Sequence, residues 1–155
     1  MGSQVSNIAF AWQWRLNKTS LESVSIDESN PTYTVINNGI YRKNGEGVID
    51  TLMATFGAIK EFTVPTGVKI INDSALGGGL EKVYLPDTVT TIKQSAFESS
   101  LITEIKIPNS VTYIHQEAFF GCNRLTKIEV DCKAGAIPNS PWGAPGGNKI
   151  VKWLR

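Results

Sequence analysis

The chain has 155 residues, a length suited to one domain with a sizeable core. Its 41% hydrophobic residues, 19% charged residues and net charge of +1 are ordinary for a globular protein and lack the basic excess typical of nucleic-acid binding. No apolar run approaches the ~18 residues that a membrane span needs. We therefore expect no nucleic-acid partner and no membrane insertion.

The start of the chain gives little information on targeting. Met1-Gly2-Ser3 resembles a cloning remnant, and no secretory signal peptide is visible. We therefore expect the native N-terminus to lie upstream.

Residues 1–27 are predicted to form a degenerate first coil that acts as an N-terminal cap. The motif Leu21-x-x-Val24-x-Ile26 has an apolar spacing that recurs in three later segments, and Ala9-Phe10 is a candidate core plug. The spacer between them carries Trp12 and Trp14. A cap is favoured over an exposed aromatic platform because terminal repeats are usually atypical.

Residues 28–60 are predicted to form a small β-meander inserted between coils. Extended runs at 33–36, 40–42 and 48–51 are separated by two segments that contain Asn-Gly. Asn-Gly between extended runs is a strong hairpin signal, because a type I′ turn needs positive φ at both central residues. The sequence leaves open whether this meander is a binding arm or an elongated coil.

Residues 61–132 contain three copies of one motif. The copies recur at a nearly constant interval, as at Pro65, Pro86 and Pro108. Apolar residues two apart predict a strand with one buried face, and the proline that follows in two copies marks its end because it cannot donate a ladder hydrogen bond. A short second extended piece then leads into a predicted helical or 3₁₀ turn with a large core plug. The plugs are Leu76, Phe97 and Phe119.

One motif copy cannot bury its own apolar face, so the copies are predicted to stack. Stacking would make a parallel sheet with one strand per coil. The interval between the copies lies in the range typical of leucine-rich repeats.

The run IPNSVTYIHQEAFFGCNRLTKIEV, from Ile107 to Val130, resembles the BspA-like leucine-rich repeats of bacterial surface proteins. Their consensus is close to L-x-x-I-x-I-P-x-x-V-T-x-I-G-x-x-A-F-x-x-C. The resemblance extends from about Leu21 to Val130, with departures at Leu76, Gly77-Gly78-Gly79 and His115. It implies an α/β leucine-rich-repeat solenoid, dominated by strands, with short helical turns and the inserted meander.

Residues 133–155 are predicted to be a C-terminal cap on a single domain that spans residues 1–155. The segment is rich in turn residues, and residues 149–155 are a candidate final strand. We expect Trp142, Trp153 and Leu154 to cover the last coil.

Residues for catalysis or metal binding are few. The single histidine, His115, follows a core isoleucine and is expected to face outward. Cys122 and Cys132 are expected to be free thiols, with Cys122 buried behind a core plug. We predict no catalytic residue, no cofactor site and no metal site, and hence no enzyme.

The outward positions of the repeat strands are the predicted partner-binding face. They form one column of Lys82, Glu104 and Lys127, and a second column of Tyr84, Lys106 and Glu129. Alternating charge within each column predicts pairing between neighbouring strands. Tyr84 is the expected main contact, because it offers apolar area with a polar tip.

The resemblance implies a non-catalytic protein-binding module, extracellular or at the cell surface. Such a module of a bacterial surface or secreted protein would adhere to or recognise a host macromolecule, such as an extracellular-matrix protein. The alternative is a structural spacer or assembly domain of a larger surface or phage-associated protein.

Overall fold

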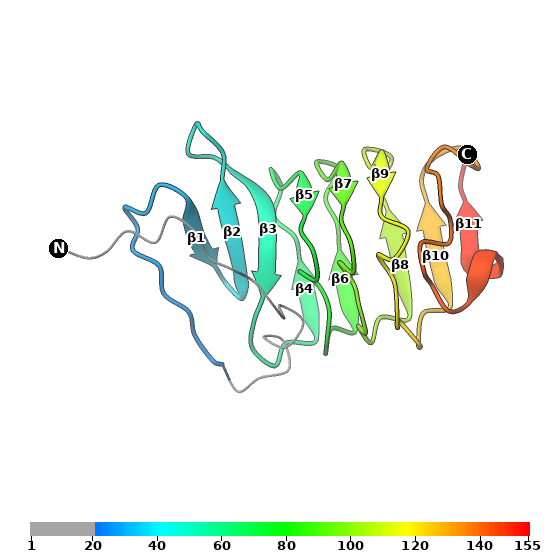
Figure 1. Cartoon of the computed structure of the whole chain (residues 1–155), viewed down its shortest axis with the longest axis horizontal. Coiled ribbons are helices and arrows are strands. Elements are labelled where there is room, and N and C mark those ends of the chain that lie inside the picture. The colour runs from blue at the N-terminus through cyan, green and yellow to red at the C-terminus, as the bar shows by residue number, and fades with distance from the viewer. Residues whose placement is uncertain (1–20) are drawn as a thin grey trace.

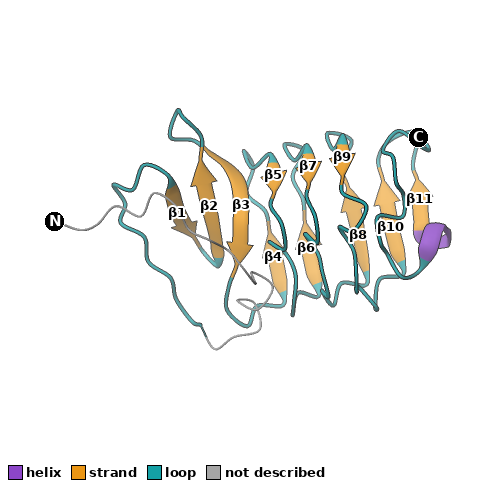
Figure 2. Cartoon of the chain, viewed as in Figure 1, coloured by secondary structure: helices purple, strands orange, loops and turns teal. Residues whose placement is uncertain are grey.

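The computed structural model describes residues 21–155 as a strand-dominated solenoid (Figures 1 and 2). Its strands follow one another along the long axis of the molecule, from the meander to the C-terminus. The described elements are β1 (Tyr33–Ile36), β2 (Gly39–Lys43), β3 (Ile49–Thr55), β4 (Glu61–Thr63), β5 (Ile70–Ile71), β6 (Lys82–Tyr84), β7 (Thr91–Ile92), β8 (Glu104–Ile107), β9 (Tyr113–Ile114), β10 (Lys127–Val130), the 3₁₀ turn η2 (Gly147–Ile150) and β11 (Val151–Trp153).

One side of the solenoid is a six-stranded sheet in the order β1-β2-β3-β5-β7-β9. The first three strands are antiparallel, and the remaining neighbours are parallel. Leu52, Ile71, Ile92 and Ile114 are successive register partners. All four are fully or almost fully buried, so this sheet supplies one wall of the core.

The other side consists of the longer repeat strands in two separate groups. β4 pairs with β6, and β8 pairs with β10, which in turn pairs with β11; all of these pairs are parallel. β6 and β8 are neighbours in space, but no ladder of hydrogen bonds joins them. Val83 and Ile105 therefore lie on adjacent strands, as predicted, but in different sheets.

Each of the central coils contributes two short strands, one to each side. The leucine-rich solenoid is therefore confirmed, but the prediction of one strand per coil is wrong. The core-plug segments are short turns rather than helices. They make i→i−3 bonds of the kind predicted for a 3₁₀ turn, such as Ala96 N–H to Lys93 O at 3.3 Å, and also bonds between coils, such as Phe97 N–H to Ala118 O at 2.9 Å.

The core plugs Leu76, Phe97 and Phe119 are completely buried, as predicted. The rings of Phe97 and Phe119 stack with their centroids 4.9 Å apart. The aromatic row continues through Trp142 to Trp153, with centroid distances of 6.4 and 6.0 Å. A row of aromatic contacts thus runs from the plug position to Trp153 of β11 in the C-terminal half of the molecule.

The meander forms as predicted, with β1 at the predicted residues and with β2 and β3 longer than the sequence indicated. Asn37 takes a φ of 51° in the tight turn between β1 and β2, the left-handed backbone that asparagine tolerates. In the last strand of the meander, β3, Leu52 lies in the main core and Met53 lies in a second hydrophobic cluster on the opposite face. The meander is therefore continuous with the coil stack, which favours an elongated coil over a projecting arm.

The segment before the meander departs from its prediction. Residues 21–27 form no strand, although Leu21, Val24 and Ile26 were expected to repeat the strand template. They pack instead against the second cluster, which contains Tyr33, Ile40, Met53 and Phe56. The candidate plug Ala9-Phe10 and the tryptophans Trp12 and Trp14 lie outside the described residues.

The C-terminal segment ends in the predicted strand, which pairs with β10. Trp142 is completely buried and donates its indole N–H to Pro138 O at 2.7 Å. Trp153 is partly buried against the core, whereas Leu154 is 40% exposed. The two tryptophans therefore cover the last coil, and the same expectation for Leu154 is wrong.

Candidate functional site

A groove of about 440 Å³ lies over β6, β8 and β10. Its volume is within the range of ~300–1,000 Å³ common for ligand pockets. All six residues of the predicted partner-binding face line it: Lys82, Tyr84, Glu104, Lys106, Lys127 and Glu129. The structure thus brings the two predicted columns into one concave surface, which we call the β6/β8 groove.

The groove follows the interruption between the two sheets. In a parallel pair, the main-chain groups of one residue point to one neighbouring strand, and those of the next residue point to the other. Tyr84 O accepts from Val64 N–H of the coil before, at 3.0 Å. Thr103 O accepts from Thr126 N–H of the coil after, at 2.9 Å. This alternation directs the main-chain groups of Val83, Glu104 and Lys106 toward the gap between β6 and β8.

Tyr84 is the largest exposed apolar surface in the groove. The burial of β6 alternates, with Lys82 exposed, Val83 buried and Tyr84 49% exposed. The predicted outward orientation of Tyr84 is therefore confirmed, and its side chain lines the groove. Leu85, which follows, is half-buried against the core.

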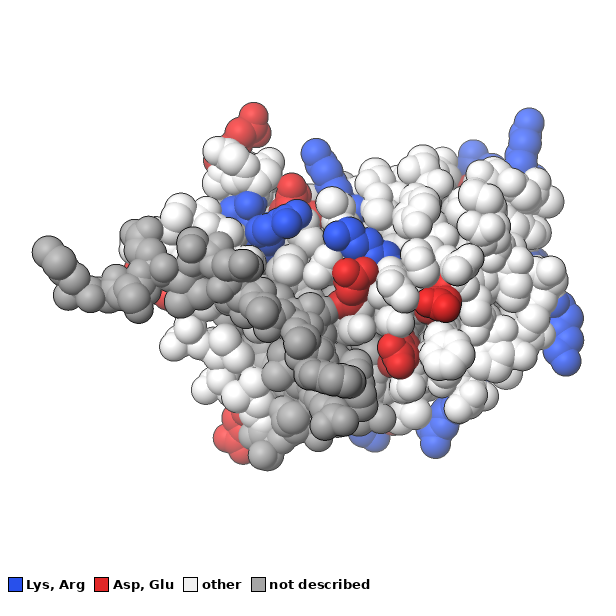
Figure 3. Space-filling view, viewed as in Figure 1, with Lys and Arg blue, Asp and Glu red and all other residues white. Residues whose placement is uncertain are grey.

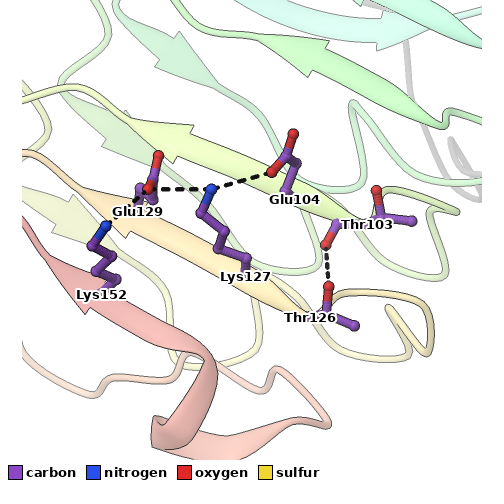
Figure 4. Close-up of polar contacts among 6 residues, drawn as sticks. All are labelled: Thr103, Glu104, Thr126, Lys127, Glu129 and Lys152. Atoms are coloured by element: carbon purple, nitrogen blue, oxygen red, sulfur yellow. Dashed lines mark hydrogen bonds and ion pairs between the residues drawn. The ribbon is translucent and has the colours of Figure 1, made fainter.

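Lys127 is the centre of an ion-pair network at one side of the groove (Figure 4). Its ammonium group lies 3.2 Å from a Glu129 oxygen and 3.3 Å from a Glu104 oxygen. Lys152 of β11 approaches the same Glu129 oxygen at 3.6 Å. Glu129 and, to a lesser degree, Glu104 raise the pKa of Lys127, and Lys127 in turn lowers the pKa of Glu129.

The predicted charge columns are only partly reproduced. Glu104 and Lys127 pair across neighbouring strands as expected. Lys82 and Lys106 form no ion pair with any residue of the described part of the chain. Lys82 loses its expected partner because β6 and β8 are not in one ladder, and Lys106 loses Glu129 to Lys127 and Lys152.

Lys106 has one further electrostatic neighbour, Asp131. Arg155 is the main cause of the lowered pKa of Asp131, and Lys106 contributes a smaller effect. The Arg155 side chain lies 2.8 Å from the Asp131 carboxylate. The charge of Asp131 is thus compensated chiefly by Arg155, which leaves Lys106 available to a ligand in the groove.

Sequence reasoning missed three charged residues in or beside this surface. Lys152 joins the network, and Glu81 and Asp87 line the groove. Lys152 was detectable, because it follows Glu129 at the same interval at which Glu129 follows Lys106. Glu81 pairs with Lys60 at 3.2 Å, so its charge is compensated outside the groove.

The face of the molecule seen in Figure 3 carries acidic and basic side chains among many uncharged ones, rather than one large field of a single sign. With a net charge of +1, long-range attraction of a strongly charged partner is weak.

The residues with catalytic potential are apart from this groove and engaged elsewhere. Cys122 is completely buried, its thiol donates to Phe97 O at 3.0 Å, and burial raises its pKa. His115 accepts from Glu117 N–H at 3.2 Å through Nδ1. Cys122 and Cys132 are not bonded to each other. Within residues 21–155, no three metal-ligating side chains are grouped, and no helix is long and apolar enough to cross a membrane.

Six copies of the BspA type leucine-rich repeat region match residues 52–141. The chain belongs to the BspA-type leucine-rich repeat family. The match starts in β3 and includes the whole β6/β8 groove, so it begins later and ends later than the resemblance seen in the sequence. It places the end of the meander, residues 52–60, inside the repeat array.

Two solved structures resemble this BspA-type chain. A leucine-rich repeat protein from Eubacterium ventriosum is 25% identical with a TM-score of 0.69, and the alignment covers 86% of this chain. A leucine rich cell surface protein from Faecalibacterium prausnitzii is 20% identical with a TM-score of 0.57 over 85% of this chain, which shows the fold alone. The aligned parts are 36% and 42% of those longer chains. No curated protein matches the BspA-type chain.

Proposed function

We propose that this BspA-type chain is a non-catalytic protein-binding module of a bacterial surface or secreted protein. Its role is adhesion to, or recognition of, a host macromolecule, and the β6/β8 groove is the contact surface. The observation that carries the proposal is the exposed Tyr84 in a concave surface between Lys82 and Lys106, neither of which has an ion-pair partner in the described chain. Half-exposed tyrosines with polar neighbours are typical of binding hot spots.

Two further observations support this proposal. The repeat family consists of modules whose stacked coils present extended surfaces suited to macromolecules. The similar protein from Faecalibacterium prausnitzii is described as a cell surface protein, which supports an extracellular location for this chain. The burial of Cys122 and the peripheral place of the single histidine support the non-catalytic part of the proposal.

The test is binding of the immobilised protein to a panel of purified host extracellular-matrix proteins, measured by biolayer interferometry. Wild-type protein is compared with Tyr84→Ala and with Tyr113→Ala. Tyr113 is the matched control because it is 45% exposed but belongs to β9 on the opposite sheet. We expect Tyr84→Ala to weaken binding by more than about tenfold, as for a hot-spot residue, and Tyr113→Ala to leave it unchanged.

Absence of binding to every matrix protein would contradict host recognition through these ligands and favour the structural-spacer alternative. Equal losses of binding affinity in the two tyrosine variants would contradict the proposal that the β6/β8 groove is the contact surface. A melt of each variant controls for folding, and we expect Tyr84→Ala to change stability by no more than ~0.5 kcal/mol, as is usual for an exposed position.

A further inference from the structure

The chain contains two Asn-Gly dipeptides, both in the meander, and the structure places them in different surroundings. Gly39 of the first dipeptide is a buried residue of β2, with register partners in β1 and β3. Gly45 of the second is exposed in the loop between β2 and β3. The same dipeptide therefore occurs once in a paired strand and once in an open loop.

The two asparagine side chains also differ in their hydrogen bonds. Asn38 donates its Nδ2–H to Phe56 O at 3.2 Å, and its main-chain O accepts from Phe56 N–H at 3.0 Å. Asn44 Oδ1 accepts from the N–H groups of Glu46 and Val48, both at 3.0 Å. Within residues 21–155, neither Asn44 Nδ2 nor the Gly45 N–H has a hydrogen-bond partner.

The bonds to Oδ1 fold the Asn44 side chain back over the Gly45 peptide group. The bond from Glu46 N–H closes a ring that includes Cγ of Asn44 and the nitrogen of Gly45, the arrangement called an Asx turn. Holding two reacting groups in a fixed geometry accelerates their reaction. Apart from the chain neighbours of Gly45, no atom lies within 4 Å of the place where its Cβ would stand, so this nitrogen is unshielded.

We propose that Asn44 is a site of spontaneous deamidation, a covalent modification that needs only water and hydroxide. The Gly45 nitrogen loses its proton to hydroxide and forms a bond to Cγ of Asn44, while the N–H groups of Glu46 and Val48 stabilise the negative charge on Oδ1. The Cγ–Nδ2 bond then breaks, and Nδ2 takes a proton from water and leaves as ammonia. Water opens the resulting succinimide ring to aspartate or isoaspartate.

The product changes the charge and the loop of the meander. A carboxylate adds one negative charge, which takes the formal net charge from +1 to 0. In isoaspartate the main chain runs through Cβ and Cγ, which disturbs the bonds of Asn44 N–H to Val48 O and of Gly47 N–H to Asn44 O. This turn is separate from the residues that line the β6/β8 groove, so the inference is independent of the proposed function.

The test is incubation of the folded protein in mildly alkaline buffer at body temperature, followed by peptide mapping with mass spectrometry. Deamidation appears as the mass gain from amide to acid, and electron-transfer fragmentation separates aspartate from isoaspartate. We expect Asn44 to convert at least about tenfold faster than Asn38, because reaction at Asn38 first requires β2 to open. In protein unfolded by guanidinium, the two rates should agree within about threefold, because the paired strand is lost.

Gly45→Ala tests the attack by the Gly45 nitrogen. A methyl group fits the open space at this position, and Gly45 has no positive φ, so the fold should be unchanged. The methyl group shields the nitrogen and should slow the conversion of Asn44 by at least about tenfold. The rate at Asn38 in the same molecule is the internal control.

Three results would each overturn the inference. The first is an equal rate at the two asparagines of the folded protein. The second is an unmodified Asn44 in the folded protein after a time in which the unfolded protein converts. The third is an unchanged rate at Asn44 in Gly45→Ala.

Discussion

Phe97 and Phe119 occupy the same position of consecutive coils, and both are completely buried. Their rings stack at 4.9 Å, so each ring is enclosed by its own coil and by the next. Phe97→Ala removes a large side chain from a position with no access to solvent. We expect a loss of ~3–5 kcal/mol in the free energy of unfolding, measured by denaturant melts.

The adjacent Phe120 provides a matched control, because its side chain is 58% exposed. Phe120→Ala should change stability by no more than ~0.5 kcal/mol, since no cavity forms. A near-neutral Phe97→Ala, or equal losses in both variants, would contradict the role of Phe97 as a core plug.

The two thiols differ in exposure and should differ in reactivity. Burial raises the pKa of both thiols, but Cys122 is fully buried whereas Cys132 is only partly buried. A buried thiol reacts slowly because the reagent cannot reach it easily and because little of it is in the reactive thiolate form. With a disulfide reagent at mildly alkaline pH, we expect one thiol of the native protein to react quickly and the second only after unfolding.

Cys132→Ser is the control for this assignment. The folded Cys132→Ser protein should lose the fast reaction, and only the slow reaction of Cys122 should remain. Two equally fast thiols in the wild-type protein would mean that the coil around Cys122 opens readily.

The ion-pair network around Lys127 joins strands β8, β10 and β11 and allows a prediction of how Glu129 titrates. Lys127 and Lys152 lower the pKa of Glu129, so its carboxylate stays charged to a lower pH than usual. The sign follows from linkage: this pairing stabilises the folded state above the ordinary carboxyl pKa and is lost as pH falls through the lowered value. NMR titration of the glutamate carboxyl signals measures the pKa directly.

Lys127→Gln should raise the pKa of Glu129 toward its ordinary value, because Lys127 is the larger cause of the shift. Lys152→Gln should raise it less, since its contact is longer at 3.6 Å. A titration of Glu129 that is unchanged in Lys127→Gln would contradict the network.

Whole-molecule stability is predicted to be additive along the coil stack. In a solenoid each coil contacts mainly its neighbours, so a change at one end acts first on that end. Trp153 closes the C-terminal end through Trp142, with ring centroids 6.0 Å apart. In Trp153→Ala, we expect hydrogen exchange to accelerate most at the amides of β10 and β11 and least at those of β3 and β5.

The Leu154 N–H bond to Val130 O, at 2.9 Å, is a sensitive reporter of this end. Leu154→Ala is the matched control, because Leu154 is 40% exposed and should alter exchange little. Uniform acceleration over all strands in Trp153→Ala would show that the stack unfolds as a single unit.

The sequence by itself determined the repeated parts of this protein. The regular interval between the motif copies predicted the stacking of coils, and the position after each repeated alanine identified Phe97 and Phe119 as plugs. The alternation around Tyr84 and Lys106 correctly predicted that these side chains project from the same face. These features depend on the burial of single side chains, which the local pattern of apolar residues encodes.

Only the tertiary structure decided how neighbouring coils are bonded. No hydrogen-bond ladder joins β6 to β8, and the plug segments are turns. Glu129 forms ion pairs with Lys127 and Lys152 rather than with Lys106. Residues 21–27 pack on the meander without a strand. The physical reason is that main-chain pairing and the choice of ion-pair partner depend on the offset between successive coils, which the pattern within one coil does not specify.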